Sequence, residues 1–233
     1  MKSAFITRNI NKNGSFFKTL THQDFEVNGL SFIEFKAVQV ATFPTCDWIF
    51  FYSKNGIRFF FEQVQRLDLN IRNLDCKWAT IGQASTTYLE KFGIKADFIG
   101  TGEPLSTSKA FIKLAKNQQV LFPRAFNSKK SIQNILGNQI KAIDLVIYEN
   151  YFIQNIEKRN EYFLVFTSPM NAQAYFNTFQ LDDYQHVIAI GQTTAKALIE
   201  LGINDFTISN QPSEEDLAEA VLNNIPNNKG RTL

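Results

Sequence analysis

The chain has 233 residues, of which 44% are hydrophobic and 20% are charged, with 24 Lys and Arg against 22 Asp and Glu. This length suits two domains of ordinary size, and the apolar fraction is high enough for packed cores, which excludes a disordered chain. The formal charge of +2 is nearly balanced, so the composition favours neither a nucleic-acid partner nor a membrane surface. A large anionic small molecule remains a compatible ligand, because it needs only local positive potential.

Cysteine and histidine usage argues against disulfide and metal sites. Cys46 and Cys76 lack metal-ligand spacing, and two such thiols are typical of a reduced intracellular chain. His22 and His186 are far apart, and neither has a carboxylate or thiol cluster at ligand spacing, so we predict no metal. The fingerprints GxGxxG, the P-loop and GxSxG are absent from the sequence, which gives no support for a nucleotide cofactor.

Targeting segments are not evident. The first residues, MKSAFITRNINKNG, lack the apolar core of a signal peptide, and no stretch approaches the roughly 20 apolar residues of a membrane span. We therefore expect a cytoplasmic protein.

The apolar runs predict strands of two kinds. WIFFY at 48–52, YFLVFT at 162–167 and HVIAI at 186–190 are apolar throughout, which is typical of parallel strands covered by helices on both faces. Residues 31–42 alternate apolar and polar side chains, and 144–153 form a second extended stretch. Such alternation indicates half-exposed strands, and the two segments could pair.

Helices are predicted after the apolar strands. Gly93 and Gly202 follow the last periodic residues and fit the left-handed position at a helix C-terminus. The last helix begins within PSEEDLAEAVL at 212–222, where Ser213 is a good N-cap and acidic residues fill the first turn. Since parallel strands need crossover helices, the pattern predicts a doubly wound α/β fold.

Three pairs of segments match each other in the same order, which indicates an internal duplication. The paired segments are 5–9 with 121–125, 49–64 with 164–179, and 79–94 with 188–203. Arg8 precedes Ser53 by 45 positions, and Arg124 precedes Ser168 by 44. The glycines of each Gly-Gln turn precede the helix-ending glycines by 11 positions in both halves.

The ordered set of motifs resembles the uroporphyrinogen-III synthase family. The segments that carry this resemblance are SKNGIRFF (53–60), LFPRAFNS (121–128), VIYEN (146–150), SPMNAQAYF (168–176), IGQTTAKALIELGI (190–203) and QPSEEDLAEAV (211–221). The resemblance implies two flavodoxin-like, doubly wound parallel-sheet domains joined by a two-stranded linker. Mapped onto this chain, it implies a discontinuous domain of residues 1–36 plus 154–233, a second domain of 43–147, and linker strands at 37–42 and 148–153.

The same resemblance implies an activity in haem biosynthesis. The family converts hydroxymethylbilane, a linear tetrapyrrole with eight carboxylate side chains, into uroporphyrinogen III. The ring closes through a spiro intermediate, the terminal pyrrole is inverted and water is lost. We therefore expect a monomeric lyase without cofactor or metal, whose site lies in the cleft between the domains.

Polar turns predict where the carboxylates bind. In open α/β sheets, ligands lie at the carboxyl ends of the strands, beside helix N-termini whose free amides favour anions. The candidates are Ser53, Lys54, Ser85, Ser168, Thr193 and Thr194 in such turns, with Arg8 and Arg124 after the matched first strands. The alternative is simple helix capping for the hydroxyl residues and a surface or capping role for the arginines.

Tyr148 is the predicted catalytic residue. It ends the apolar run DLVIY and matches a tyrosine of the family motif. A phenol with a reference pKa near ~10 keeps its proton at neutral pH, so it could hydrogen-bond the departing hydroxyl of the substrate. The alternative is an amphipathic strand-end residue whose hydroxyl lies at the surface.

The 23 phenylalanines are predicted to lie mostly in the cores. Phe59, Phe60 and Phe61 are consecutive and cannot share one helix face, so none is assigned to the site.

Two other functions fit the sequence. A non-catalytic two-domain ligand-binding module, similar in layout to periplasmic binding domains, would carry the same strand and helix pattern. A scaffold that holds a partner enzyme is the third possibility.

Overall fold

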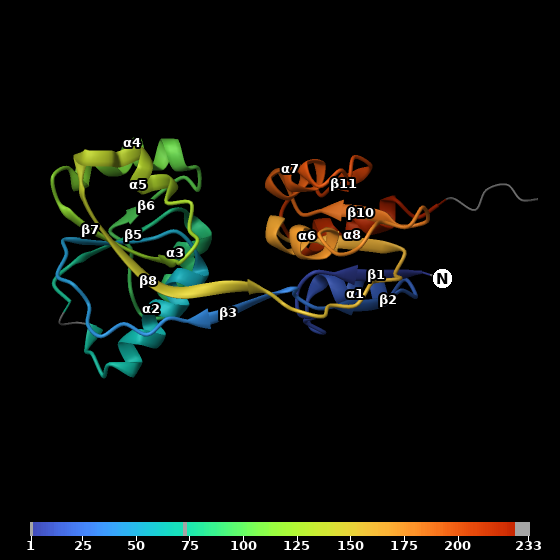
Figure 1. Cartoon of the computed structure of the whole chain (residues 1–233), viewed down its shortest axis with the longest axis horizontal. Helices are drawn as coiled ribbons and strands as arrows, with labels where there is room; N and C mark the ends of the chain where they lie inside the picture. Colours follow the sequence, from blue (N-terminus) through green and yellow to red (C-terminus); the bar gives the residue numbers. More distant parts are fainter. Residues whose placement is uncertain (1, 72–73, 227–233) are drawn as a thin grey trace, which may run out of the picture. The chain divides into compact units, whose positions relative to one another are not determined.

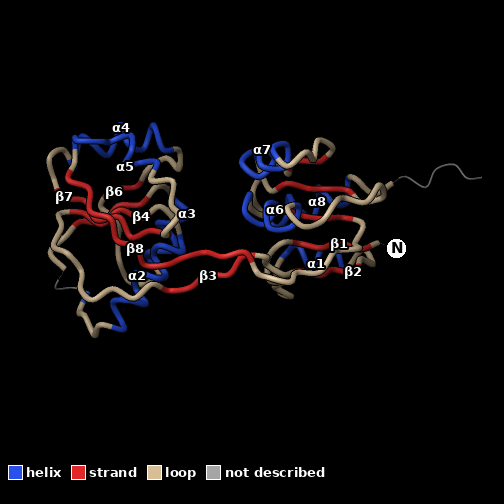
Figure 2. Tube along the Cα trace, viewed as in Figure 1, coloured by secondary structure: helices blue, strands red, loops and turns tan. Residues whose placement is uncertain are grey.

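The computed structural model describes residues 2–71 and 74–226. The chain divides into two compact units, of which unit 1 comprises Met1–Glu34 and Tyr151–Leu233 and unit 2 comprises Phe35–Asn150. Each unit contains a sheet with helices packed against it (Figure 2). The predicted α/β class with parallel sheets is confirmed.

Unit 1 is built on a five-stranded sheet with the order β11-β10-β9-β1-β2. Its strands are β1 (Ser3–Ile6), β2 (Glu26–Gly29), β9 (Phe163–Phe166), β10 (His186–Ala189) and β11 (Phe206–Ile208). Every neighbouring pair in this sheet is parallel. All residues of β1 and β9 are buried, because helices cover both faces of the sheet.

The helices of unit 1 form two pairs. α1 (Ser15–Thr21) packs against α8 (Glu214–Asn223), and α6 (Pro169–Phe176) packs against α7 (Gln192–Glu200). The first pair encloses one core, which contains Phe16, Leu20, Leu217 and Val221. The second pair encloses another core, in which Tyr175 is fully buried.

Unit 2 is built on a six-stranded sheet with the order β3-β8-β7-β4-β5-β6. Its strands are β3 (Ile33–Ala37), β4 (Trp48–Phe51), β5 (Lys77–Thr80), β6 (Phe98–Ile99), β7 (Gln119–Ala125) and β8 (Lys141–Phe152). The strands from β4 to β8 pair in parallel. β3 is hydrogen-bonded to β8 and lies beside it (Figure 1).

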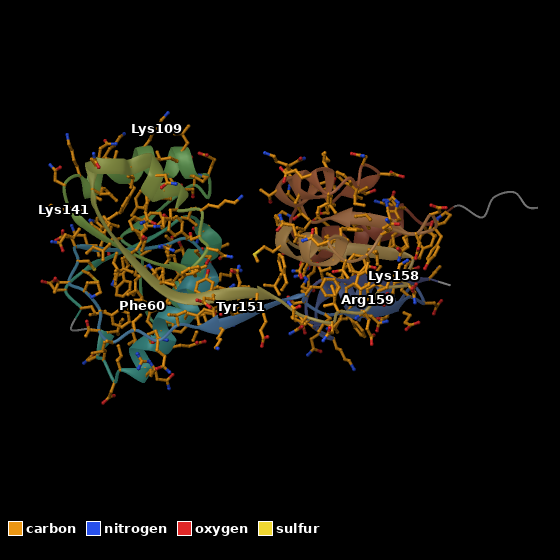
Figure 3. All side chains as sticks on the ribbon, in the orientation of Figure 1. Phe60, Lys109, Lys141, Tyr151, Lys158 and Arg159 are labelled. Atoms are coloured by element: carbon orange, nitrogen blue, oxygen red, sulfur yellow. The ribbon has the colours of Figure 1, made fainter. Side chains whose placement is uncertain are left out.

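The helices of unit 2 also pack in pairs on the sheet. α2 (Lys54–Arg66) contacts α3 (Gln83–Glu90), and α4 (Pro104–Ala115) contacts α5 (Ser131–Leu136), which continues into the short 3₁₀ helix η2 (Gly137–Gln139). The core beneath α2 contains Phe59 and the fully buried Phe60, whose side chain lies inside unit 2 (Figure 3). A second core, around Phe111 and Phe122, lies beneath α4 and α5.

Three predicted helix ends are confirmed by the structure. Gly93 and Gly202 have φ values of +75° and +82°, which is the left-handed conformation that ends helices. Ser213 accepts a hydrogen bond from Asp216 N at 3.0 Å and therefore caps α8. Both cysteines are free thiols, and no helix in the described part of the chain is long and apolar enough to cross a membrane.

The stretch predicted at 144–153 differs from its expected form. β8 begins at Lys141, and seven of its first eight residues pair with β7 inside the sheet of unit 2. The crossings between the units, at 34/35 and 150/151, fall within β3 and β8. The sequence pattern identified the exposed C-terminal end of β8. The strand begins earlier than expected, at Lys141, because its N-terminal half pairs along the whole of β7.

Candidate functional site

Ser53 and Tyr148 come together at the carboxyl edge of the sheet in unit 2. Ser53 follows β4 and is the N-cap of α2, where its Oγ accepts a hydrogen bond from Gly56 N at 3.1 Å. The Tyr148 hydroxyl lies 3.4 Å from the same Oγ. Ser53 Oγ therefore caps α2 and also contacts the phenol of Tyr148, so helix capping and a role in the site are compatible for this residue.

The Tyr148 ring is held on the face of the sheet that α2 covers. It is 7% exposed and stacks on Phe59, with ring centroids 4.8 Å apart and an interplanar angle of 14°. Burial raises the pKa of Tyr148, while the Ser53 hydrogen bond and the charge of Arg58 lower it by less. The phenol therefore keeps its proton at neutral pH and can donate it in a hydrogen bond. The alternative of a surface hydroxyl on a strand end does not describe this buried residue.

The neighbouring turns of unit 2 present the other predicted polar groups. Lys54 is the first residue of α2, and its side chain is exposed. Ser85 is buried in the first turn of α3, whose N-cap, Gly82, provides no side-chain oxygen. The Thr86 hydroxyl contacts Thr80 Oγ1 at 2.6 Å, so it serves the interior of the unit.

Arg124 is committed to contacts within the chain. Its guanidinium is 7% exposed and pairs with Asp144 through Nε at 2.7 Å and Nη2 at 2.8 Å. Nη1 donates to the carbonyls of Ala125 and Phe126. The prediction that Arg124 pairs with a ligand carboxylate does not fit this arrangement, because each outer nitrogen already has a protein acceptor.

Asp144 collects further donors from the segment after β7. Lys130 Nζ lies 2.5 Å from Oδ2, and Gln133 Nε2 donates to Oδ1 at 2.7 Å. These hydrogen bonds, with that of Arg124 the strongest, hold the pKa of Asp144 well below its usual range. Gln133 also accepts from the Tyr52 hydroxyl at 3.1 Å, so the network connects α5 to the end of β4.

The carboxyl edge of the sheet in unit 1 has a related turn. Ser168 follows β9 and caps α6, accepting from Asn171 N at 3.2 Å and from Asn171 Nδ2 at 3.0 Å. Thr193 is exposed in the first turn of α7, whereas Thr194 is 1% exposed. The exposed Thr193 hydroxyl and the first-turn amides of α7 are therefore the groups that a carboxylate could approach here.

Arg8 retains donors that the described protein does not use. Its Nη1 lies 3.6 Å from Glu214 Oε1 at the start of α8. This single long ion pair contrasts with the network of hydrogen bonds around Arg124. Nε and Nη2 are buried and have no hydrogen-bond partner among residues 2–71 and 74–226. The prediction of an anion-binding role for Arg8 therefore remains compatible with its surroundings.

Sequence reasoning missed the groups that support these turns. Thr7 Oγ1 accepts from Thr167 N at 2.9 Å, and Thr167 Oγ1 donates to Thr7 O at 2.9 Å. Asn171 Oδ1 accepts from Phe32 N at 2.8 Å. Their signal in the sequence was only a polar residue directly after an apolar strand or in the first turn of a helix. Among the described residues, no group of three or more His, Cys, Asp or Glu side chains is placed to hold a metal ion.

Comparison with known proteins gives a consistent result. A family model described as "Uroporphyrinogen-III synthase HemD" matches residues 17–219. A uroporphyrinogen-III synthase of Chlorobaculum parvum is 27% identical over 231 residues, which cover 87% of this chain and 91% of that protein. A porphyrin biosynthesis protein HemD of Ruminiclostridium josui is also 27% identical, over 82% of this chain and 43% of its own length.

Solved structures support the fold. The crystal structure of uroporphyrinogen-III synthetase from Helicobacter pylori superposes with a TM-score of 0.73 at 21% identity, covering 96% of this chain and 99% of that one. A mutant uroporphyrinogen III synthase from Thermus thermophilus gives a TM-score of 0.63 at 14% identity, covering 96% and 97% of the two chains.

Proposed function

The chain belongs to the uroporphyrinogen-III synthase family, and from this premise we propose that it converts hydroxymethylbilane into uroporphyrinogen III. In this reaction the linear tetrapyrrole loses water, its terminal pyrrole is inverted and the ring closes. Beside the family match, the observation that carries the proposal is the buried phenol of Tyr148, which meets the capping hydroxyl of Ser53 at 3.4 Å.

Tyr148 acts on the leaving group in this proposal. The C–O bond of the hydroxymethyl group breaks as the phenol donates a hydrogen bond, and its proton leaves with the hydroxide as water. The substituted carbon of the terminal pyrrole then forms a C–C bond to the freed methylene carbon, which gives a spiro intermediate. Breaking the old bond to that pyrrole and forming a bond at its other side inverts the ring, and the proton released on closure restores the phenol.

The principal contribution of the protein is orientation. The pyrrole nitrogen already activates the leaving group, so the difficult step is to bring the substituted carbon to the reacting methylene. Holding two groups in a reactive geometry can lower a barrier by several kcal/mol. The raised pKa of Tyr148 fits this division of work, because it keeps the phenol protonated until the C–O bond of the substrate breaks.

The carboxylates of the substrate bind at helix N-termini and at Arg8 in this proposal. Ser53, Lys54 and Ser85 serve this purpose in unit 2, and Ser168 and Thr193 serve it in unit 1, whereas the side chain of Thr194 is omitted because it is 1% exposed. Each charge-assisted hydrogen bond contributes roughly 1.5–3 kcal/mol, so a few such contacts suffice for a protein of nearly balanced charge. Arg124 is omitted from the binding set because Asp144 and two carbonyls occupy its donors.

We further propose that the two units are flavodoxin-like domains that arose by duplication. When matched by their turns, β4, β5, β6, β7 and β8 correspond to β9, β10, β11, β1 and β2. The sheet orders β6-β5-β4-β7-β8 and β11-β10-β9-β1-β2 are then the same, which supports a common origin. The family resemblance supports a monomeric cytoplasmic enzyme that needs no cofactor.

The isomer of the product tests the proposed function. The purified protein is incubated with freshly prepared hydroxymethylbilane, and the products are oxidised and separated as type I and type III porphyrins. The substrate closes unaided to type I, so an excess of type III is the expected result. Type I alone, at the rate without protein, would contradict the proposal and would favour a ligand-binding module.

A further inference from the structure

A β-bulge directly precedes the Tyr148 position in β8. Residues Gln119 to Arg124 of β7 pair in regular register with Lys141 to Val146 of β8. The next pair is Ala125 with Tyr148, so Ile147 is an extra residue on β8. An extra residue in a strand changes which face the following side chains occupy.

The bulge determines the face on which the Tyr148 ring lies. Without it, side chains would alternate along β8, and Tyr148 would share a face with Asp144 and Val146. Instead, Leu145, Ile147 and Tyr148 all belong to the core beneath α2. The bulge therefore turns the phenol away from the side of Asp144 and toward Phe59 and Ser53.

Arg124 holds the opposite strand at this bulge. It is the last residue in regular register, and its Nη1 donates to the carbonyls of Ala125 at 2.8 Å and Phe126 at 3.0 Å. Phe126 N in turn donates to Tyr148 O at 2.9 Å. The guanidinium is anchored by the two oxygens of Asp144, which lies on β8 before the bulge. One buried side chain thus connects both strands across the irregularity.

We propose that Arg124 is a positioning residue, which fixes the bulge that aims the Tyr148 hydroxyl at Ser53; this inference rests on the proposed function. Arg124 contacts no reacting atom. It acts through the backbone of Ala125, Phe126 and Tyr148, and its removal lets the end of β8 relax toward regular register.

A double-mutant cycle on turnover tests this coupling. Arg124→Gln is expected to lower kcat for type III formation about tenfold to a hundredfold, with a smaller change in KM, because a displacement of ~1 Å can cost ~100-fold. In the Tyr148→Phe background the same change is expected to have little further effect on kcat. An equal loss of kcat in both backgrounds would overturn the proposal, since a general structural defect acts regardless of the phenol.

Lys130→Gln is the matched control. It removes another positive charge from the same carboxylate, but Arg124 still contacts both carbonyls. Its kcat is expected to stay within about twofold of the unmodified protein. If Lys130→Gln lowers kcat as much as Arg124→Gln, the charge around Asp144 is responsible and the positioning role is wrong.

Ultraviolet titration of tyrosinate tests the inference without any turnover. The Tyr148 signal is assigned by subtracting the titration of Tyr148→Phe from that of the protein. Arg124→Gln is expected to bring the pKa of Tyr148 down toward its ordinary value near ~10, because the ring loses its buried place. An unchanged titration would overturn the proposal even if type III formation failed. If Arg124→Gln does not fold, Asp144→Asn serves instead, because it removes the carboxylate that anchors the guanidinium. It is expected to lower both kcat for type III formation and the pKa of Tyr148.

Discussion

Replacing Ser53 by alanine removes one oxygen atom that has two partners. Its Oγ accepts from Gly56 N at 3.1 Å and lies 3.4 Å from the Tyr148 hydroxyl. Ser168 offers a matched comparison, because its Oγ accepts from Asn171 N at 3.2 Å on a backbone of nearly the same φ, −163° against −160°. The second partner of Ser168 is the amide of Asn171 instead of a phenol.

The two substitutions are expected to cost similar stability. Removing a serine N-cap destabilises a helix by about 0.5–2 kcal/mol. The contact between Ser53 and Tyr148 is long at 3.4 Å, and its loss adds at most about 0.5 kcal/mol. Urea unfolding monitored by far-ultraviolet circular dichroism, which reports on the helices of both units, should therefore show a decrease of about 1 kcal/mol in the free energy of unfolding for Ser53→Ala and for Ser168→Ala.

The two variants are expected to differ in turnover. Ser53→Ala should lower kcat for type III formation about threefold to tenfold, since it releases the phenol, whereas Ser168→Ala should mainly raise KM. Ser53→Thr keeps the oxygen and should restore most of both losses. An equal fall of kcat in both alanine variants would refute the role assigned to Ser53, and unchanged unfolding of either variant would refute the capping argument for it.

Three further predictions concern single side chains. Tyr148→Phe should lower the rate of type III formation without loss of folding, as judged by circular dichroism; an unchanged rate would remove the phenol from the mechanism. Asp144→Asn should lower the free energy of unfolding at pH 7 by about 1–2 kcal/mol, because Arg124 loses a charged partner and partial exposure screens the pair. The depressed pKa of Asp144 means that its ionised form stabilises the fold above the unfolded pKa of about 4 and that this stability is lost as the pH falls. Urea unfolding between pH 7 and pH 2 should therefore show that the difference in the free energy of unfolding between Asp144→Asn and the unmodified protein decreases as the pH falls. A difference that stays constant would contradict the stabilising role of ionised Asp144. Gly202→Ala, at a φ of +82°, should cost about 1 kcal/mol in the same assay, whereas Gly191→Ala, with extended backbone and open space around its Cβ position, should cost less.

Local rules made the helix boundaries predictable. Ser53, Ser168 and Ser213 cap helices where a hydroxyl follows an apolar strand or precedes an acidic turn, since capping depends on neighbours within three or four positions. Gly93 and Gly202 end helices for an equally local reason. The fully apolar strands predicted parallel sheets because burial on both faces leaves no polar alternation.

The partners of individual side chains could not be predicted in the same way. Arg124 looked equivalent to Arg8, yet it pairs with Asp144, which lies 20 positions away on the adjacent strand. That pair depends on the register of β7 against β8, which cannot be read from the local pattern of either strand alone. The bulge at Ile147 is likewise invisible in the run DLVIY, where regular alternation would place Tyr148 on the opposite face.

The order of strands along the chain has a consequence for synthesis. All of unit 2 is continuous in sequence, so it has every strand of its sheet from β4 to β8 once residue 150 has emerged from the ribosome. Strand β1 precedes all of unit 2 in the chain, but its neighbour β9 ends at Phe166, after unit 2. One edge of β1 must therefore wait through the synthesis of another sheet before β9 pairs with it, and in that interval this apolar strand is exposed to aggregation and to chaperones.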